Sequence, residues 1–355
     1  MRKNSKIYIA GHRGMVGSSL MRLLQKNGYT NIVTRRHSGL DLTRQIEVEK
    51  FFQKERPEHV FLAAAKVGGI LANDTYKAEF IYDNIMIAVN IVHSSYKYGV
   101  KKLLNLGSSC IYPKFASQPM KEESILDGRL EPTNEPYAIA KISALKLCRY
   151  YNEQYGTNYI SVMPTNLYGY NDDFNLETAH AFPALIRKFH LAKLLKHNDI
   201  NGIKEDIQRY PLGFKFNNEK ILKSAESIKK HLKKLGITKD YVTLWGTGEA
   251  YREFLHVDDL ADACVYLMKN YNYKDVGEII NIGTGEDLKV KELADLVREI
   301  VGFEGEIRYD FSKPEGTPRK LLDVSKAKSL GWEAKISLRE GIRKTYNWYC
   351  NVRHE

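Results

Sequence analysis

The fold of this chain is decided by the stretch Lys6-Ile7-Tyr8-Ile9-Ala10-Gly11-His12-Arg13-Gly14-Met15-Val16-Gly17. Its first five residues are typical of a buried strand, its three glycines form a loop, and leucines at 20, 23 and 24 mark one side of a following helix. In this order, glycines let backbone N–H groups approach a pyrophosphate at the helix N-terminus. We therefore predict a dinucleotide site that is built from Gly11, Arg13, Gly14, Met15, Val16 and Gly17.

Further strand-like segments alternate with helical stretches along the first half of the chain. A long helix is expected over about 76–98, and a late strand at 278–282 should return to the same sheet. This alternation predicts an α/β fold, a doubly wound parallel sheet of the Rossmann type beside a smaller mixed α/β part. Ligands then bind at the carboxyl ends of the strands. The four further strands of the first half are predicted at 31–34, 59–65, 102–107 and 159–163.

Arginines follow the second predicted strand. A site that prefers NAD usually places an acidic residue at this point, where it binds the ribose 2′-hydroxyl. Arg35 and Arg36 stand there instead and suit a 2′-phosphate, which Arg13 of the glycine loop could also reach. NADP is therefore favoured, although a solvated basic turn would have the same sequence.

The stretch Pro132-Thr133-Asn134-Glu135-Pro136-Tyr137-Ala138-Ile139-Ala140-Lys141 carries the predicted chemistry. Pro136 suits the first turn of a helix, and Tyr137 and Lys141, four residues apart, then share one face of it. A neighbouring ammonium is expected to lower the pKa of the phenol, so that the tyrosine exchanges a proton with a ketone or an alcohol. Alone, the pattern fits a solvated lysine beside a half-buried tyrosine equally well.

Polar segments at the ends of two predicted strands strengthen the catalytic interpretation. The fourth strand leads into Gly107-Ser108-Ser109-Cys110, and the fifth into Pro164-Thr165-Asn166-Leu167. Carboxyl ends of parallel strands meet at one edge of a sheet. Ser108, Tyr137 and Lys141 should therefore converge where a nicotinamide would lie.

Composition narrows the class of protein. The chain has 355 residues with 43% hydrophobic and 27% charged residues, and no apolar run approaches the roughly 18 residues of a membrane span. The four cysteines show no metal-ligand spacing, so we predict no metal and expect reduced thiols in a cytoplasmic protein without a signal peptide. The net charge of +11 suits a phosphate-bearing small ligand better than nucleic acid, because its excess is concentrated in one segment.

That segment, residues 191–241, contains twelve basic and six acidic residues. Within it, apolar residues recur at helical spacing over 218–235, and Gly236 follows as a C-terminal signal, which predicts an amphipathic helix. We expect a cofactor domain at 1–170, with returning segments near 250–285, and a mostly substrate-binding domain at 171–355. The basic segment would be an insertion in the latter, either as a surface elaboration or as a modifier of the sugar pocket.

Six motifs closely resemble those of the GDP-L-fucose synthase family, within the extended short-chain dehydrogenase/reductases. The resemblance runs over nearly the whole chain except about 191–241, and the motifs are specific to that family rather than to the fold. They are Gly-His-Arg-Gly-Met-Val-Gly (11–17), Ala-Ala-Ala-Lys-Val-Gly-Gly-Ile (63–70), Gly-Ser-Ser-Cys-Ile-Tyr-Pro-Lys (107–114), Glu-Pro-Thr-Asn-Glu-Pro-Tyr-Ala-Ile-Ala-Lys (131–141), Arg-Glu-Phe-Leu-His-Val-Asp-Asp (252–259) and Lys-Pro-Glu-Gly-Thr-Pro-Arg-Lys (313–320).

The resemblance implies an NADPH-dependent enzyme, expected to be a homodimer, that acts on GDP-4-keto-6-deoxy-mannose. Members of the family epimerise C3 and C5 of the sugar and then reduce the C4 ketone. Carried over, Ser108 and Tyr137 hold the C4 oxygen, Lys141 tunes the tyrosine and holds the nicotinamide ribose, and Cys110 and His180 act as base and acid. The same resemblance implies further cofactor contacts from Pro164, Asn166, Leu167 and His180, and contacts with the GDP-sugar from Lys188, Trp245, Arg252 and Lys320.

Several residues keep a second interpretation. Taken singly, Cys110 could be a small core residue and His180 a structural histidine. Trp245 could lie in the core or could line a ligand site. Asp258 is expected to be the N-cap of the next helix. His37 stands where the family carries an arginine, which shifts the expected 2′-phosphate contact to Arg35 or Arg36.

The basic insertion is larger than the family pattern, which leaves the sugar open. The alternatives are a C4 reductase without epimerase activity, acting on a related GDP-4-keto sugar such as a 6-deoxyheptose, and a silent NADPH-binding sensor or scaffold.

Overall fold

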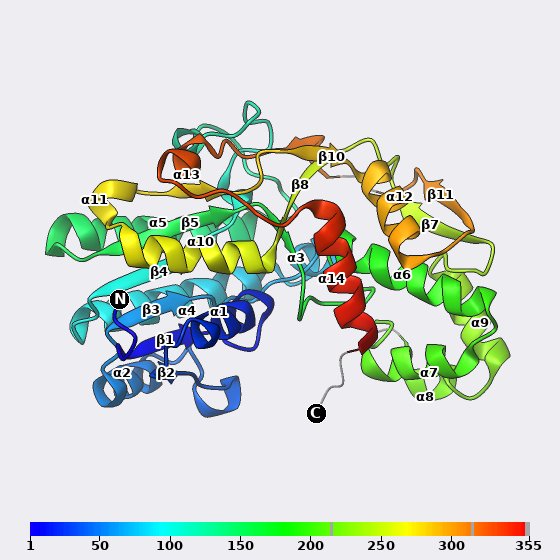
Figure 1. Cartoon of the computed structure of the whole chain (residues 1–355), viewed down its shortest axis with the longest axis horizontal. Coiled ribbons are helices and arrows are strands. Elements are labelled where there is room, and N and C mark those ends of the chain that lie inside the picture. The colour runs from blue at the N-terminus through cyan, green and yellow to red at the C-terminus, as the bar shows by residue number, and fades with distance from the viewer. Residues whose placement is uncertain (214–215, 314–315, 352–355) are drawn as a thin grey trace.

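The computed structural model describes residues 1–213, 216–313 and 316–351 (Figure 1). Within these residues the main sheet is wholly parallel, with strand order β2-β1-β3-β4-β5-β9. The predicted Rossmann-type sheet is confirmed, and the late strand returns to it beside β5. The strands are β1 (Ile7–Ala10), β2 (Ile32–Val33), β3 (His59–Leu62), β4 (Lys102–Leu106), β5 (Tyr159–Pro164) and β9 (Ile280–Ile282).

Helices cover both faces of this sheet and enclose separate apolar cores. One core lies between the sheet and α1 and α10, and the other between the sheet and α2, α4 and α5. The long helix expected over 76–98 is α4, and the short α3 precedes it. The helices are α1 (Met15–Lys26), α2 (Gln45–Glu55), α3 (Ile70–Thr75), α4 (Lys77–Lys97), α5 (Glu135–Tyr155) and α10 (Val257–Asn270), with the shorter α11 (Tyr273–Val276), η1 (His37–Gly39), η2 (Ser109–Ile111) and η3 (Glu122–Ser124).

A second group of elements surrounds a third core beyond the carboxyl ends of the main strands, on the right of Figure 1. Strands β10, β8 and β12 form a small sheet in which β6 also pairs with β8, and β7 pairs with β11. In the part of the chain that the structure describes, no helix has the length and apolar character needed to cross a membrane. The strands are β6 (Asn166–Tyr168), β7 (Tyr241–Trp245), β8 (Tyr251–His256), β10 (Asp287–Lys289), β11 (Glu306–Asp310) and β12 (Arg319–Lys320), and the helices are α6 (Ala181–Lys196), α7 (Ile200–Arg209), α8 (Asn218–Ile221), α9 (Ala225–Lys234), α12 (Val290–Val301) and α14 (Leu338–Asn351). The short α13 (Ser325–Ser329) returns to the main sheet, where Ala327 joins the core that α1 and α10 cover.

The single helix predicted over 218–235 is wrong, because α8 and α9 divide it. Ser224 accounts for the break, since its hydroxyl accepts a hydrogen bond from the Ser227 N–H and so caps a new helix. The apolar stripe itself is confirmed, with Ile221, Ile228 and Leu232 buried. Phe214 and Lys215 of the basic segment, and Pro314 and Glu315 of the last quoted motif, lie outside the described residues.

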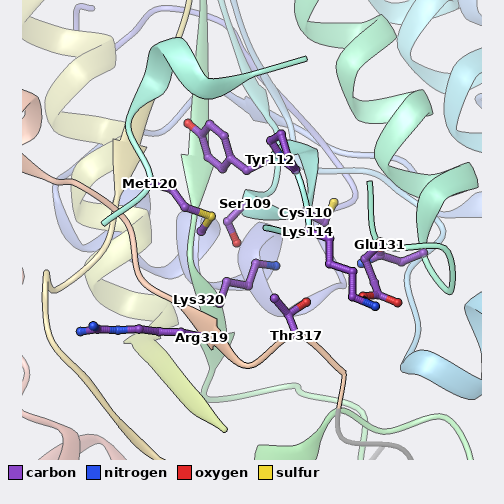
Figure 2. Close-up of a pocket in the computed structure, with 11 residues that line it drawn as sticks. Ser109, Cys110, Tyr112, Lys114, Met120, Glu131, Thr317, Arg319 and Lys320 are labelled. Carbon is purple, nitrogen blue, oxygen red and sulfur yellow. The ribbon is translucent and has the colours of Figure 1, made fainter. Parts of the chain in front are cut away.

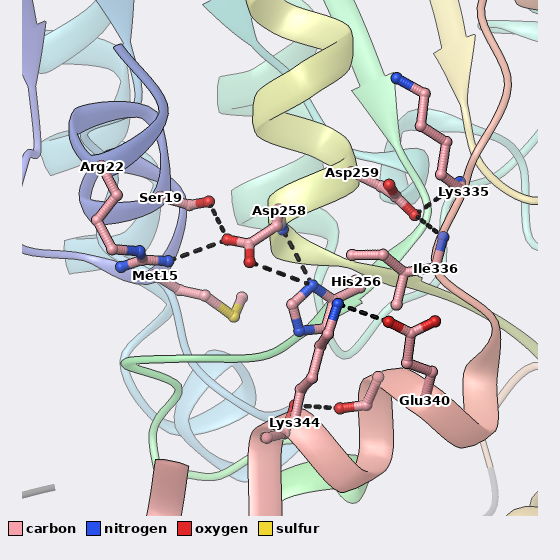
Figure 3. A network of polar contacts seen from close by, with 12 residues as sticks. Met15, Ser19, Arg22, His256, Asp258, Asp259, Lys335, Ile336, Glu340 and Lys344 are labelled. Carbon is pink, nitrogen blue, oxygen red and sulfur yellow. Dashed lines mark hydrogen bonds and ion pairs between the residues drawn. The ribbon is translucent and has the colours of Figure 1, made fainter. Parts of the chain in front are cut away.

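Asp258 is not the N-cap of α10, as the sequence had predicted. His256 holds that position, and its Nδ1 accepts a hydrogen bond from the Asp258 N–H at 3.2 Å. The Asp258 carboxylate instead accepts hydrogen bonds from Ser19 Oγ at 2.5 Å and Arg22 Nη2 at 3.0 Å (Figure 3). The aspartate therefore fastens α1, the helix after the glycine loop, to α10.

A buried ion pair ties the basic segment to α6 and α14. Arg187 on α6 is 0% exposed, and its Nε donates to Asp206 Oδ1 on α7 at 3.0 Å. The Tyr349 hydroxyl on α14 donates to the same carboxylate. The guanidinium also donates to the carbonyls of Phe174, Tyr210 and Pro211, so its hydrogen-bonding groups are well paired. The segment is thus anchored in the third core.

Replacing Asp206 with Ala should destabilise the protein strongly, because the Arg187 guanidinium would stay buried without its carboxylate. Breaking a buried pair in this way costs about 3–5 kcal/mol. The free energy of unfolding in urea measures the effect. As a control, Glu299→Ala removes the exposed pair with Arg339, for which only a small loss is expected because solvent screens it. Equal losses in the two variants would contradict this account.

Candidate active site

The first turns of α5 bring Tyr137 and Lys141 to one side of the helix, as the spacing predicts. Pro136 lies in the first turn, where its missing N–H costs no hydrogen bond. Lys141 is buried, and its Nζ donates to the Leu106 carbonyl at 2.7 Å and lies 5.6 Å from the centroid of the Tyr137 ring. Because Leu106 ends β4, this bond holds the lysine at the carboxyl edge of the main sheet.

The expected lowering of the pKa of Tyr137 is not found. Burial raises the pKa of the phenol, and the nearby Cys110 raises it further. Burial also lowers the pKa of Lys141 to about 8, an effect that Cys110 partly opposes. Tyr137 is therefore held as a neutral phenol, which is the protonation state that a proton donor requires.

Ser108 and Cys110 follow β4 at the same edge. The Ser108 hydroxyl accepts a hydrogen bond from the Cys110 N–H at 3.3 Å and caps the short helix η2. Burial raises the pKa of the Cys110 thiol, and Lys320 is the strongest of the groups that oppose this rise. No cause for an activated thiol was visible near Cys110 in the sequence, because Lys320 comes from β12, over two hundred residues away.

A cavity of about 40 Å³ adjoins the cysteine (Figure 2). Polar and charged side chains form much of its wall, and Lys114 and Glu131 form an ion pair at 2.8 Å on one side. Lys320 enters from β12 on the other side. The residues that line the cavity are Ser109, Cys110, Tyr112, Pro113, Lys114, Met120, Glu131, Asn134, Thr317, Arg319 and Lys320.

The other residues singled out for the sugar nucleotide lie on α6, β7 and β8. His180 is exposed at the N-cap of α6, while Lys188 donates to the Thr243 carbonyl at 2.9 Å, and burial lowers the pKa of Lys188 to about 8. Trp245 is 56% exposed and therefore not a core residue. Arg252 pairs in register with Lys320, where β8 runs beside β12.

Glu253 is a site-forming residue to which the sequence analysis gave no role. It is 0% exposed, and its carboxylate accepts hydrogen bonds from the N–H groups of Thr284 at 2.6 Å, Gly285 at 2.8 Å and Leu322 at 3.0 Å. Its carbonyl accepts one from Asn166 Nδ2 at 2.8 Å. The alternation of side chains along β8 could have suggested that the Glu253 carboxylate points inward. It could not have identified the backbone N–H groups that bind this carboxylate.

The glycine loop has the close backbone contacts that a dinucleotide site needs. Gly11 has a φ of +82°, and a Cβ on Gly17 would lie 2.1 Å from the Gly11 carbonyl oxygen. Beyond Gly14, which begins α1 as its N-cap, the helix continues through Met15 and Val16. The loop therefore brings its backbone close to the helix N-terminus, where phosphate oxygens can be bound.

The arginines near this loop differ in their surroundings. Arg35 forms an ion pair with Glu55 at 2.5 Å and lies over the Phe51 ring. Arg13 and Arg36 are exposed, and together with burial their charges lower the pKa of His12. Both therefore lie close enough to the loop to bind a phosphate there.

Pro164 ends β5, and Asn166 and Leu167 begin β6 at the same edge of the sheet. Together with the glycine loop and the Tyr137–Lys141 pair, they define an enzyme of the short-chain dehydrogenase/reductase class. Among the described residues, no group of three or more His, Cys, Asp or Glu side chains is placed to hold a metal ion.

Residues 7–206 and 211–283 match the NAD dependent epimerase/dehydratase family. GDP-L-fucose synthase 1 of Arabidopsis thaliana is 52% identical over 353 residues, covering 98% of this chain and 95% of the relative. The GDP-L-fucose synthase of Escherichia coli (strain K12) is 45% identical over 350 residues, covering 97% and 96%. A solved GDP-6-OMe-4-keto-L-xylo-heptose reductase from C. jejuni is 44% identical, covers 98% of both chains and has a TM-score of 0.90. The chain belongs to the NAD dependent epimerase/dehydratase family, in the group that contains the GDP-L-fucose synthases.

Replacing Lys320 with Met should make the Cys110 thiol less reactive. Without the ammonium, the pKa of the thiol rises further, so less thiolate is present at a given pH; each tenfold loss of thiolate slows alkylation about tenfold. The measurement is the rate of iodoacetamide labelling of Cys110 against pH, by mass spectrometry, in a Cys350→Ser background. Lys289→Met removes a half-buried charge that pairs with Glu249 outside the cavity, and serves as control. Identical labelling profiles in both variants would rule out the role of Lys320.

Proposed function

We propose that the protein is an NADPH-dependent GDP-4-keto-6-deoxy-sugar 3,5-epimerase and 4-reductase. One observation carries this proposal. At the carboxyl end of β4, the segment with Ser108 and Cys110 meets the start of α5 with Tyr137 and Lys141. The glycine loop follows β1 at the same edge of the sheet. Relatives named GDP-L-fucose synthase, at 45% and 52% identity over nearly the full chain, support the choice of sugar nucleotide. The direct test incubates the enzyme with GDP-4-keto-6-deoxy-mannose and NADPH and identifies the products by NMR.

The residues at the glycine loop fit NADPH. The close backbone of Gly11 and Gly17 suits a pyrophosphate, and the exposed Arg13 and Arg36 suit a 2′-phosphate. Pro164, Asn166, Leu167 and His180 are the proposed contacts on the nicotinamide side. Bound NADPH supplies the hydride for C4 of the sugar.

In the reduction, Tyr137 donates its phenolic proton to the C4 oxygen, and the Ser108 hydroxyl hydrogen-bonds to the same oxygen. Donors aimed at an oxygen that gains negative charge stabilise the transition state. Lys141, held by the Leu106 carbonyl, stabilises the phenolate that remains on Tyr137 and binds the nicotinamide ribose. The result is an alcohol at C4.

In the epimerisation, Cys110 as thiolate removes the proton from C3 or C5, and the electron pair moves to the C4 oxygen as an enolate. The donors Tyr137 and Ser108 hold that oxyanion. His180 then returns a proton to the opposite face of the carbon. One pair of oxygen ligands therefore serves both reactions, and the sugar need not leave the site between them.

Contacts with the GDP-sugar are assigned to the smaller group of elements. Lys188 and Trp245 lie on α6 and β7, and Arg252 and Lys320 lie side by side on β8 and β12. We propose residues 1–170, with the returning segments near 250–285, as the cofactor domain, and 171–355 as mostly the substrate domain. The basic insertion is part of the latter.

A reductase that lacks epimerase activity is the second candidate. Two observations favour it, namely that burial raises the pKa of the Cys110 thiol and that solved relatives at 44% identity are named GDP-6-OMe-4-keto-L-xylo-heptose reductase and GDP-mannoheptose C4 reductase. Solvent-deuterium incorporation at C3 and C5, measured without NADPH, separates the candidates. Absence of exchange would leave only the reductase.

We also propose that the protein is a homodimer that pairs through α4 and α5. These helices contact each other closely, and their outer surface exposes large apolar side chains. Sedimentation equilibrium of the wild type and of a Tyr82→Glu, Tyr150→Glu double variant tests this proposal. The exposed residues are Tyr82, Val89, Tyr96, Ile139, Tyr150 and Tyr155.

Tyr137→Phe should lower the reductase kcat while GDP-sugar binding is largely kept, because only the transferable proton is removed. Loss of general acid catalysis costs roughly 10²–10⁴-fold. Steady-state NADPH oxidation measures it. Tyr159→Phe is the matched control: this hydroxyl is buried on β5 and has no hydrogen-bond partner within the described residues. A Tyr137→Phe enzyme that keeps more than about half its activity has another proton donor.

Arg36→Ala should raise the KM for NADPH about tenfold or more, because a charge-assisted bond to the 2′-phosphate is lost. The kcat/KM for NADH, which lacks this phosphate, should change much less. Arg35→Ala is the matched control, since its guanidinium is already engaged by Glu55. A larger effect from Arg35→Ala, or equal kcat/KM values for both cofactors in the wild type, would contradict the assignment.

A further inference from the structure

Asp173 lies in the loop that leads into His180 at the start of α6, and its carboxylate organises this loop. Its Oδ1 accepts a hydrogen bond from the Asn175 N–H at 2.9 Å, and its Oδ2 accepts one from the Thr178 hydroxyl. The Asn175 carbonyl in turn accepts hydrogen bonds from the N–H groups of Thr178 at 3.1 Å and Ala179 at 2.7 Å. One carboxylate therefore helps to fix the backbone that ends in His180.

A contact from outside holds the same loop just before His180. The Gly69 N–H donates to the Thr178 carbonyl at 2.8 Å. A Cβ on Gly69 would lie 2.7 Å from the Ala179 carbonyl oxygen, so the two backbones can approach this closely only at a glycine. The chain between Asp173 and His180 is therefore held by its own carboxylate on one side and by the segment before α3 on the other.

Two charged groups act on His180 among the described residues, namely Asp173 from its own loop and Lys320 from β12. His180 is exposed to solvent on one side but is surrounded by protein, and desolvation lowers the pKa of its imidazole; the Asp173 carboxylate raises this pKa, and the Lys320 ammonium lowers it. Lys320 also lines the cavity beside Cys110 (Figure 2), where it opposes the rise in the pKa of the thiol. The ammonium that favours a thiolate at Cys110 therefore disfavours an imidazolium at His180.

The proposed epimerisation needs both residues in their charged forms at one pH. The Cys110 thiolate takes the proton from C3 or C5, and the electron pair of the broken C–H bond moves to the C4 oxygen. The His180 imidazolium then gives its ring proton to the opposite face of the carbon, where the returning electron pair forms the new C–H bond. The neutral thiol and the neutral imidazole afterwards exchange a proton through water, which restores both charges.

Lys320 can stabilise only the first of these two charges, so the imidazolium needs an anion of its own. A nearby opposite charge favours the charged form of a titratable group. Enzymes separate the roles of base and acid by giving two titratable groups different surroundings. Lys320 provides such surroundings for Cys110, and Asp173 provides them for His180.

We propose that Asp173 is a positioning residue that keeps His180 protonated as the acid of the epimerisation, against the charge of Lys320. This inference rests on the proposed function and deepens it, because it explains how a base and an acid can coexist in one site. Asp173 acts through His180, and no contact with the sugar is assigned to it.

The test follows the ring signals of His180 by NMR against pH, with His180→Asn to identify them. Asp173→Asn removes the charge but keeps the size of the side chain and an acceptor for the Asn175 N–H. The pKa of His180 should fall in this variant, because the imidazolium loses its carboxylate. Asp173→Glu restores the charge and should restore the titration, whereas Lys320→Met should shift it in the opposite direction.

Asp41→Asn is the matched control for the titration. The Asp41 carboxylate also accepts hydrogen bonds from a backbone N–H and a threonine hydroxyl, both of Thr43, but it is not among the groups that act on His180. The titration of His180 should therefore be the same in Asp41→Asn and in the wild type.

Deuterium incorporation at C3 and C5 of the sugar, measured in D₂O without NADPH, gives the catalytic consequence. At a pH above the titration of His180, Asp173→Asn should lower the incorporation by the factor by which it lowers the imidazolium fraction seen by NMR. Reduction of a pre-epimerised 4-keto sugar does not use the His180 proton and should change much less. NADPH binding, followed by fluorescence, shows that each variant is folded.

The outcomes separate this inference from the function on which it rests. A His180 titration that is the same in Asp173→Asn and the wild type overturns the inference and leaves the proposed function standing. A shifted titration with unchanged deuterium incorporation also overturns it, because His180 would then not be limited by its proton. A wild type that incorporates no deuterium refutes the proposed epimerisation itself, and the inference falls with it.

Discussion

The buried carboxylate of Glu253 is the contact on which the geometry of the site depends. It lies on β8 next to Arg252, and it binds the backbone of the loop after β9 and of the segment after β12. Each bond fixes main chain rather than a side chain, so the positions of Lys320 and the end of the main sheet are set together. Burial raises the pKa of Glu253, and the backbone donors oppose this rise. The charged form of the buried carboxylate therefore depends on these hydrogen bonds, and the two backbone segments depend on the carboxylate for their position.

The sequence predicted the main sheet, the glycine loop and the Tyr137–Lys141 pair, because local patterns determine them. Alternating strands and helices dictate a parallel sheet, and a four-residue spacing dictates a shared helix face. The helix break at Ser224 was missed because the apolar stripe continues across it, while only the hydroxyl cap reveals the new start. Likewise, the sequence does not show whether an asparagine at the start of a helix caps it, and Asn134 at the N-cap of α5 makes no such hydrogen bond.

The electrostatics could not be predicted from the sequence because they come from distant segments. Lys320 opposes the rise in the pKa of Cys110 from another part of the chain. Of the two adjacent exposed arginines, Arg35 forms an ion pair with Glu55, and Arg36 forms none among the described residues. Burial and the nearby Cys110 raise the pKa of Tyr137, while the Lys141 ammonium donates to a backbone carbonyl. Spacing shows which groups can meet, whereas burial decides their protonation.

The buried contact between Arg187 and Asp206 has a consequence for protein engineering. The basic segment cannot be exchanged between members of the family on its own. Its Asp206 neutralises Arg187, which lies on α6 one residue before Lys188. A chimaera that omits the segment must also replace that arginine with an apolar side chain. A chimaera that receives the segment must also receive Arg187 and the Tyr349 hydroxyl, because the Asp206 carboxylate would otherwise be buried without its partners.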